Sequence, residues 1–201
     1  MKKGLIALFL LLIAACAAEE TYDPLEEYEE LDPTTVIGAP DARPGAVAPD
    51  DRDMVERGQY LVQLLGCGAC HTDGALTGAP NPERLLAGSR VGIAYTSPLE
   101  NRNPGVIYPA NITPDMETGI GNWSNQQIAN AIRAGVGSHG GGRIETMPWQ
   151  GYALLTDDDV DSIVAYLRSI PPVEHSVPRQ VRPGQRAREN FVYFGVYWSN
   201  D

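Results

Sequence analysis

The sequence contains very little lysine and very little cysteine. Lysine occurs only at Lys2 and Lys3, in a chain of 201 residues that has 26 acidic residues and a formal net charge of −11. Such a chain is a poor ligand for a polyanion, which argues against nucleic acid as a partner and favours docking onto basic protein surfaces. With only three cysteines, no disulfide framework is expected.

The sequence also lacks an apolar run long enough to span a bilayer. Its first residues instead form a secretory signal, in which the two lysines precede a short apolar stretch at residues 5–13. The signal ends in Ala14-Ala15-Cys16, which resembles the lipobox of bacterial lipoproteins. We therefore expect residues 1–15 to be a lipoprotein signal peptide and Cys16 to be lipidated, anchoring the protein to a bacterial membrane on the periplasmic side. Ordinary cleavage at nearby small residues, giving a soluble periplasmic protein, is the alternative.

Residues 16–52 are acidic and interrupted by prolines. From position 17 to position 53 there are 12 acidic residues and two arginines. So few apolar side chains cannot offset the entropy lost on ordering, and we expect a disordered tether behind the lipid anchor. The alternative is a short helix that binds a partner through Tyr22, Leu25, Tyr28 and Leu31.

The most specific motif is Cys67-Gly68-Ala69-Cys70-His71. Cys-x-x-Cys-His is the attachment signature of a c-type haem, in which each thiol forms a thioether with a porphyrin vinyl group. His71 then lies under the iron as its proximal ligand. A redox dithiol or half of a zinc site is the alternative. A zinc site would need a second ligand pair, for which only Cys16 remains, and a dithiol has no need of the adjacent histidine. The motif therefore predicts one covalently bound haem c.

The sixth coordination position of the iron needs a second ligand. The candidates are Met54, Met116, Met147, His139 and His175. Met147 is favoured because it precedes Pro148 in a loop between two predicted helices, and a following proline favours an extended backbone that can direct the thioether inward. Met116 is the runner-up, and an isolated methionine is more often core filler. A His71/Met147 pair would fill both axial positions and raise the reduction potential, which indicates electron transfer.

Three helices are predicted around these ligands. Residues 53–65 have apolar positions spaced by three and four, with Asp53 as N-cap, and Gly58 could let another helix cross closely. A second helix begins at a capping box formed by Ser124 and Gln127 and ends at Gly135.

The third predicted helix begins at Thr156, carries acidic residues in its first turn and stops before Pro171-Pro172. Residues 72–122 have no sustained periodicity and are rich in Gly, Pro and Asn. We expect this long segment to wrap the haem and to use it as core.

With these elements the chain resembles the class I c-type cytochromes. It is most similar to the haem domains in cytochrome subunits of bacterial membrane-bound alcohol and gluconate dehydrogenases. The shared phrases are Arg57-Gly58-Gln59-Tyr60-Leu61-Val62, the haem motif, Asn111-Ile112-Thr113-Pro114-Asp115, Thr118-Gly119-Ile120-Gly121-Asn122-Trp123-Ser124, Met147-Pro148-Trp149 and Ile163-Val164-Ala165-Tyr166-Leu167-Arg168-Ser169-Ile170-Pro171-Pro172.

The resemblance covers residues 53–175 and implies an all-α, class I cytochrome c fold whose first and last helices cross near the haem. It implies an electron carrier rather than an enzyme in its own right. Relatives of the dehydrogenase type often carry several haems, whereas this chain has one attachment motif, which favours a single-haem shuttle.

Further haem contacts are expected from residues in the loops. Trp123 and Arg143 could hydrogen-bond the haem propionates, and Asn111 with Tyr108 could line the pocket, with ordinary packing as the alternative for each. Residues 176–201 form a tail in which arginines precede a cluster of aromatic residues. This tail either folds back onto the haem domain or docks a larger redox complex.

The leading hypothesis is a membrane-tethered carrier of single electrons between an oxidoreductase and a terminal acceptor. A fixed cytochrome c subunit of a dehydrogenase or respiratory complex is the second hypothesis. The third is a haem enzyme or gas sensor with an open iron site, which requires that Met147 does not ligate.

Overall fold

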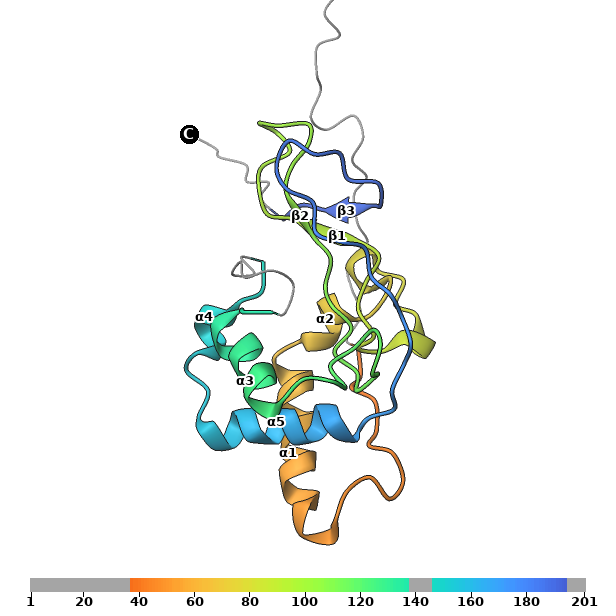
Figure 1. Cartoon of the computed structure of the whole chain (residues 1–201), viewed down its shortest axis with the longest axis vertical. Coiled ribbons are helices and arrows are strands. Elements are labelled where there is room, and N and C mark those ends of the chain that lie inside the picture. Colours follow the sequence, from red (N-terminus) through yellow and green to blue (C-terminus); the bar gives the residue numbers. More distant parts are fainter. Residues whose placement is uncertain (1–36, 138–145, 195–201) are drawn as a thin grey trace, which may run out of the picture.

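The computed structural model describes residues 37–137 and 146–194. At the base of the molecule, α1 (Arg52–Leu64) crosses α5 (Asp157–Ser169), and these two helices make the most extensive contact between any two described elements (Figure 1). Gly58 lies at the crossing, where its missing side chain brings the backbones together. The predicted first and last helices, and the role of Gly58 between them, are therefore confirmed.

Three shorter helices complete the helical part. They are α2 (Cys67–His71), α3 (Asn125–Ala134) and α4 (Trp149–Tyr152). The Ser124 hydroxyl accepts a hydrogen bond from the backbone N–H of Gln127, and the Gln127 side chain accepts one from that of Ser124, so the predicted capping box is present. The prediction of Asp53 as cap of α1 is wrong, because the helix begins at Arg52 and Asp53 lies in its first turn.

The main core lies between α1, α5 and α3. It buries the apolar faces of the two crossing helices together with residues of the loops between them. Its buried members are Val55, Leu61, Val62, Leu86, Ile120, Ile128, Val160, Ile163, Val164, Tyr166, Leu167 and Ile170. Burial of these faces supplies most of the driving force for the crossing.

A small sheet makes the all-α expectation only partly correct. It contains β1 (Gly92–Ala94), β2 (Val106–Ile107) and β3 (Phe191–Val192) in the order β2-β1-β3. β1 pairs antiparallel with β2 and parallel with β3. Ile93 and Val192 bury their side chains with Leu76 in a second core cluster. The long segment after the haem motif thus builds part of its own core.

Three short 3-10 helices lie in the connecting segments. They are η1 (Pro49–Asp51), η2 (Ala75–Thr77) and η3 (Pro82–Arg84). η2 contributes the buried Leu76 to the second cluster. No helix within residues 37–137 and 146–194 is both long enough and apolar enough to cross a bilayer.

The described part of the C-terminal tail folds back onto the domain. The backbone of Val181 pairs with that of Val106, and Phe191 and Val192 form β3 beside β1. Val192 is buried, whereas Phe194 is 68% exposed. Of the two alternatives for the tail, packing therefore holds for these strand residues, while the aromatic residues Tyr197 and Trp198 lie outside the described chain.

Residues 37–51, which the sequence assigned to a disordered tether, lie against the α1–α5 pair. The Tyr166 hydroxyl donates to the carbonyl oxygen of Pro40 at 2.5 Å, and the Arg43 N–H donates to that of Ser169 at 2.8 Å. Hydrogen bonds to and from its backbone, together with the packing of Ala39, Ala42 and Val47 on the main core, hold this strap. Bonds to backbone groups leave no pattern in the sequence, so the strap was not predicted. The expected lipidation residue Cys16 and the alternative helix around Tyr22 lie outside the described residues.

Candidate haem site

The two cysteines of the motif lie on α2, which follows α1 after a sharp turn. Gly66 makes the turn in a left-handed conformation at φ +68°, which a glycine adopts without strain. Positions three apart in a helix share one face, so α2 presents Cys67 and Cys70 on the same side. Both sulfurs are free thiols. Cys67 packs against the main core and Cys70 against the second cluster.

Burial keeps these two thiols protonated at neutral pH. It raises the pKa of Cys67 to about 11 and also raises the pKa of Cys70. A redox dithiol works through a thiolate whose pKa is lowered, so this environment does not suit that chemistry. Within the part of the chain that the structure describes, no three His, Cys, Asp or Glu side chains cluster as metal ligands. The dithiol and zinc alternatives therefore gain no support.

His71 ends α2 and is held on both sides. Its ring Nδ1 lies 2.7 Å from the carbonyl oxygen of Ala110, and its own carbonyl accepts a hydrogen bond from the Gly88 N–H at 2.8 Å. Burial lowers the pKa of His71, which favours the neutral ring. A neutral ring that donates from Nδ1 to a carbonyl has its lone pair on Nε2, the atom through which it can bind a metal.

Met147 lies just before α4, and α4 is tied to the haem motif. Pro148 is the N-cap of α4, and the Met147 carbonyl accepts a hydrogen bond from the Trp149 N–H at 2.8 Å. At the other end of the helix, the Tyr152 hydroxyl donates to the carbonyl oxygen of Leu65 at 3.1 Å, two residues before Cys67. Burial, and then the proximity of the two motif cysteines, raises the pKa of Tyr152 to about 12. The segment carrying Met147 is thus anchored beside α2.

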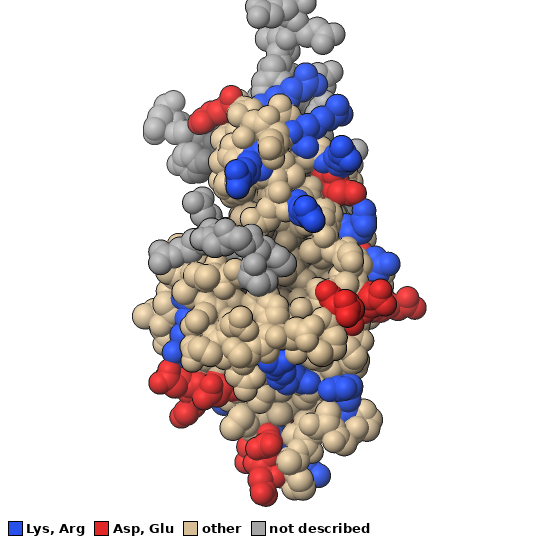
Figure 2. All heavy atoms as spheres, in the orientation of Figure 1, with Lys and Arg blue, Asp and Glu red and all other residues tan. Residues whose placement is uncertain are grey.

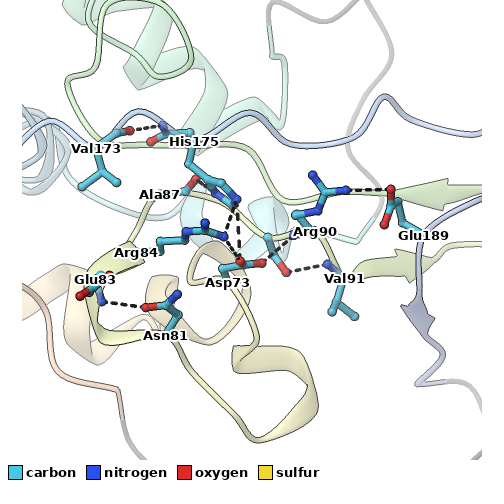
Figure 3. A network of polar contacts seen from close by, with 12 residues as sticks. Asp73, Asn81, Glu83, Arg84, Ala87, Arg90, Val91, Val173, His175 and Glu189 are labelled. Carbon is cyan, nitrogen blue, oxygen red and sulfur yellow. Dashed lines mark hydrogen bonds and ion pairs between the residues drawn. The ribbon is translucent and has the colours of Figure 1, made fainter.

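The other sixth-ligand candidates are engaged elsewhere or lie outside the described chain. Met116 is 57% exposed and lies against Gly121. His175 is buried, with Nδ1 2.9 Å from the Ala87 carbonyl oxygen and Nε2 facing Arg84 and Asp73 (Figure 3). Met54 is an exposed residue of α1. His139 is outside the described residues.

The expected loop contacts to haem take other partners. Asn111 is only 2% exposed, and its amide bonds to Thr113, Thr118 and Val173. The Tyr108 hydroxyl donates to the carbonyl oxygen of Glu189.

Trp123 packs against the main core, and its carbonyl accepts a hydrogen bond from Arg168. Trp123 also lines an open hollow with Gln127 and Val136. Arg143 lies outside the described residues. Ala110 and Tyr152 were not predicted, because a backbone carbonyl and a lone tyrosine have no sequence motif of their own.

A short helix that presents two protonated thiols on one face and ends in a histidine oriented through Nδ1 has the donor atoms that covalent attachment of a haem would require. The donor set fits that group, since the thiols and Nε2 are the atoms it requires. The family model for cytochrome c matches residues 55–171. The chain therefore belongs to the cytochrome c family, whose members carry covalently bound haem c and transfer electrons.

Several similar proteins are cytochrome subunits of dehydrogenases, as the motif resemblance indicated. The chain is 37% identical over 133 residues to the fructose dehydrogenase cytochrome subunit of Gluconobacter japonicus, covering 66% of this chain and 24% of that protein. It is 36% identical over 133 residues to the cytochrome c subunit of the quinone alcohol dehydrogenase of Gluconobacter oxydans (strain 621H), covering 64% and 24%.

The gluconate 2-dehydrogenase cytochrome c subunit of Pantoea cypripedii is 36% identical over 121 residues, covering 60% of this chain and 24% of that protein. The chain thus spans about a quarter of the length of these relatives.

Proposed function

We propose that this protein is a monohaem cytochrome c that carries single electrons outside the bacterial cytoplasm, tethered to a membrane by its N-terminus. The observation that carries the proposal is the 2.7 Å contact between His71 Nδ1 and the Ala110 carbonyl, beside two thiols on one helix face. Haem c, when attached, supplies an iron that changes its oxidation state by one electron.

Cys67 and Cys70 hold the haem covalently and His71 binds its iron in this proposal. One haem follows from the single Cys-x-x-Cys-His motif in the sequence. The test is the intact mass of the purified protein, which should exceed that of the polypeptide and its lipid by one haem. A mass without haem, or with two haems, would contradict this assignment.

Met147 is the proposed sixth ligand. Support comes from Pro148 and from the anchoring of α4 to Leu65 beside the haem motif. A methionine in this position fills the coordination shell, so that oxygen cannot bind without displacing it, and the ligands stay in place as the electron moves.

The ligand is tested with Met147→Leu, using Met116→Leu as the control because Met116 is exposed. The ferric methionine–iron charge-transfer band should disappear in Met147→Leu alone, and the ferrous form of that variant should bind carbon monoxide. A Met147→Leu protein that keeps the band would remove Met147 from the site and revive the open-site alternative.

The proposed location rests on the signal sequence and on Cys16. Lipidation at Cys16 would place the haem domain on an acidic segment above the membrane surface. In a wild-type strain, the protein should fractionate with membranes and take up labelled fatty acid. Cys16→Ser should release it into the periplasm with its haem spectrum unchanged, and a wild-type protein that is already soluble would refute the lipid anchor.

The net negative charge of the chain favours basic partners, but its arginines are not evenly spread. A local surface rich in arginine is the proposed docking site for acidic redox partners. Figure 2 shows that arginine side chains gather over the end of the molecule that carries the small sheet. Four exposed arginines of the tail, Arg179, Arg182, Arg186 and Arg188, form no side-chain hydrogen bond or ion pair within the described part of the chain. Arginine is enriched at protein interfaces, and a group of unpaired positive charges is complementary to an acidic surface.

Arg182→Gln/Arg186→Gln/Arg188→Gln should slow electron transfer to an acidic redox protein at low salt, with little effect at high salt. Arg52→Gln at the opposite end is the matched control. Equal effects of the triple variant and the control would exclude this surface as the docking site.

The second candidate function is a fixed subunit of a dehydrogenase complex, because the similar proteins are subunits of dehydrogenases. Purification of the native protein from detergent-solubilised membranes separates the two candidates. A stoichiometric large partner would favour the fixed subunit, whereas isolation of the cytochrome alone would favour the mobile carrier.

A further inference from the structure

A buried polar network lies directly behind the carbonyl that orients His71. Asn111 follows Ala110, and every polar group of its amide is engaged inside the protein. Its Nδ2 donates to the Thr118 hydroxyl at 2.9 Å and to the Val173 carbonyl at 2.7 Å. Its Oδ1 accepts from the N–H of Thr113 at 2.9 Å and from its hydroxyl at 2.7 Å. Asn111, which follows the residue that accepts from His71, is therefore held by hydrogen bonds at both its amide nitrogen and its amide oxygen.

The Thr118 hydroxyl is the junction of this network. Besides accepting from Asn111, it donates to Asp115 Oδ1 at 2.7 Å and accepts from the backbone N–H of His175 at 2.9 Å. These bonds connect the loop that carries Ala110 to the segment after α5. Because both segments are otherwise irregular, a hydroxyl that serves three partners sets their relative position.

The segment facing Ala110 is held equally closely. The Ser89 N–H donates to the Pro109 carbonyl at 3.0 Å, and the Ile112 N–H donates to the Leu86 carbonyl at 2.9 Å. Gly88 lies between them at φ +84°, and a Cβ there would stand 2.7 Å from the Asn111 nitrogen.

Next to Gly88, the Ala87 carbonyl lies 2.9 Å from Nδ1 of His175, which faces Asp73 and Arg84 (Figure 3). Hydrogen bonds between the segments on either side thus hold Ala110 in place.

We propose that Asn111 and Thr118 are positioning residues, which act through Ala110 to set how strongly His71 ligates the iron. The inference rests on the proposed haem ligation by His71. Donation from Nδ1 to a close acceptor makes Nε2 a more basic ligand, and a more basic ligand stabilises the ferric state. If the Ala110 carbonyl is held less firmly against Nδ1, Nε2 becomes less basic and the reduction potential rises.

The test compares four full-length haem-loaded variants. Thr118→Val removes the shared hydroxyl at nearly constant volume, and Thr118→Ser restores it. Ser162→Ala is the control, because the Ser162 hydroxyl donates to the backbone carbonyl of Asp158 within α5 and has no link to Ala110. Asp115→Asn serves if Thr118→Val fails to hold haem. It keeps the size of the side chain and weakens the acceptor that the Thr118 hydroxyl shares with the backbone N–H groups of Glu117 and Thr118.

The readouts are the reduction potential and the rate at which the His71 Nδ1–H exchanges with D₂O. Thr118→Val should raise the potential, with a change of about tenfold in the relative affinity for ferric and ferrous iron, or about 59 mV. Its Nδ1–H should exchange faster, Thr118→Ser should restore both values, and Asp115→Asn should shift both in the same direction by less. Ser162→Ala should lower stability and leave the reduction potential and the exchange rate unchanged.

A Thr118→Val or Asp115→Asn protein that loses stability with both readouts unmoved would overturn the positioning role. A wild-type protein whose spectrum lacks a histidine ligand would instead refute the proposed function.

Discussion

Gly58 of α1 and Ser162 of α5 touch backbone to backbone at the helix crossing. A methyl group built on Gly58 would overlap the carbonyl oxygen of Ser162 and would stand 2.6 Å from Cβ of Tyr166. The crossing supports the position of α2, because α1 leads through a single turn into Cys67. A change at Gly58 therefore tests the packing on which the haem motif rests.

Gly58→Ala should destabilise the haem-loaded protein. Alanine favours the helix by about 1 kcal/mol over glycine. Overpacking costs about 1–3 kcal/mol, and here the obstacle is backbone, which cannot move aside. Urea unfolding followed by the haem absorption should show a lower midpoint. Gly151→Ala in α4 is the control, because a methyl group there meets nothing within 4 Å. A Gly58→Ala protein as stable as the control would show that the helices separate freely.

Arg168→Lys should also destabilise the protein. Near the end of α5, the Arg168 guanidinium donates to the carbonyls of Ile120 and Gly121 at 3.2 and 3.1 Å, and also to that of Trp123. A lysine ammonium lacks the planar fork that reaches several acceptors, and losing hydrogen bonds from a charged group costs about 1.5–3 kcal/mol. Arg52→Lys at an exposed position is the control. Equal urea midpoints for the two variants would contradict the proposed role of the fork.

How far the sequence predicted this structure depended on whether the signal was local. The capping box at Ser124 and the haem motif at Cys67, Cys70 and His71 each involve residues no more than four positions apart. Both features were therefore recognised from the sequence. The pairing of β1 with β3 joins residues about 100 positions apart, and strands this short have no recognisable period. Backbone contacts were also missed, because neither the Ala110 carbonyl at His71 nor the Pro40 carbonyl at Tyr166 depends on a distinctive side chain.

Truncation should locate the boundary between the tether and the domain at the strap. A protein secreted from a cleavable signal and lacking residues 1–36 should match the urea midpoint of the wild type. Removing residues 1–44 also removes the bonds from Arg43 to Ser169 and from Tyr166 to Pro40, and should cost about 2–4 kcal/mol. Tyr166→Phe should lose only a part of this amount. Equal stability of the two truncated proteins would show that residues 37–44 belong to the tether and not to the folded domain.

An ion pair between the crossing helices should make stability depend on acid pH. Arg57 of α1 lies 2.7 Å from Asp159 of α5. The hydrogen bond from Arg57, and then that with Thr156, holds the pKa of Asp159 below its ordinary value of 3.8. A carboxyl whose pKa is lower in the folded state stabilises the fold above the unfolded pKa, and that stability is lost as the pH falls through the folded pKa.

Asp159→Asn should therefore show a shallower loss of stability than the wild type as the pH falls from about 5 to 3. The effect should be small, because Arg57 is exposed, and it should weaken further at high salt. Arg57→Gln should flatten the same part of the curve, and the double variant should add nothing to either single change. Urea midpoints measured across this range at low salt provide the test, and parallel curves for wild type and Asp159→Asn would exclude Asp159 as the titrating group.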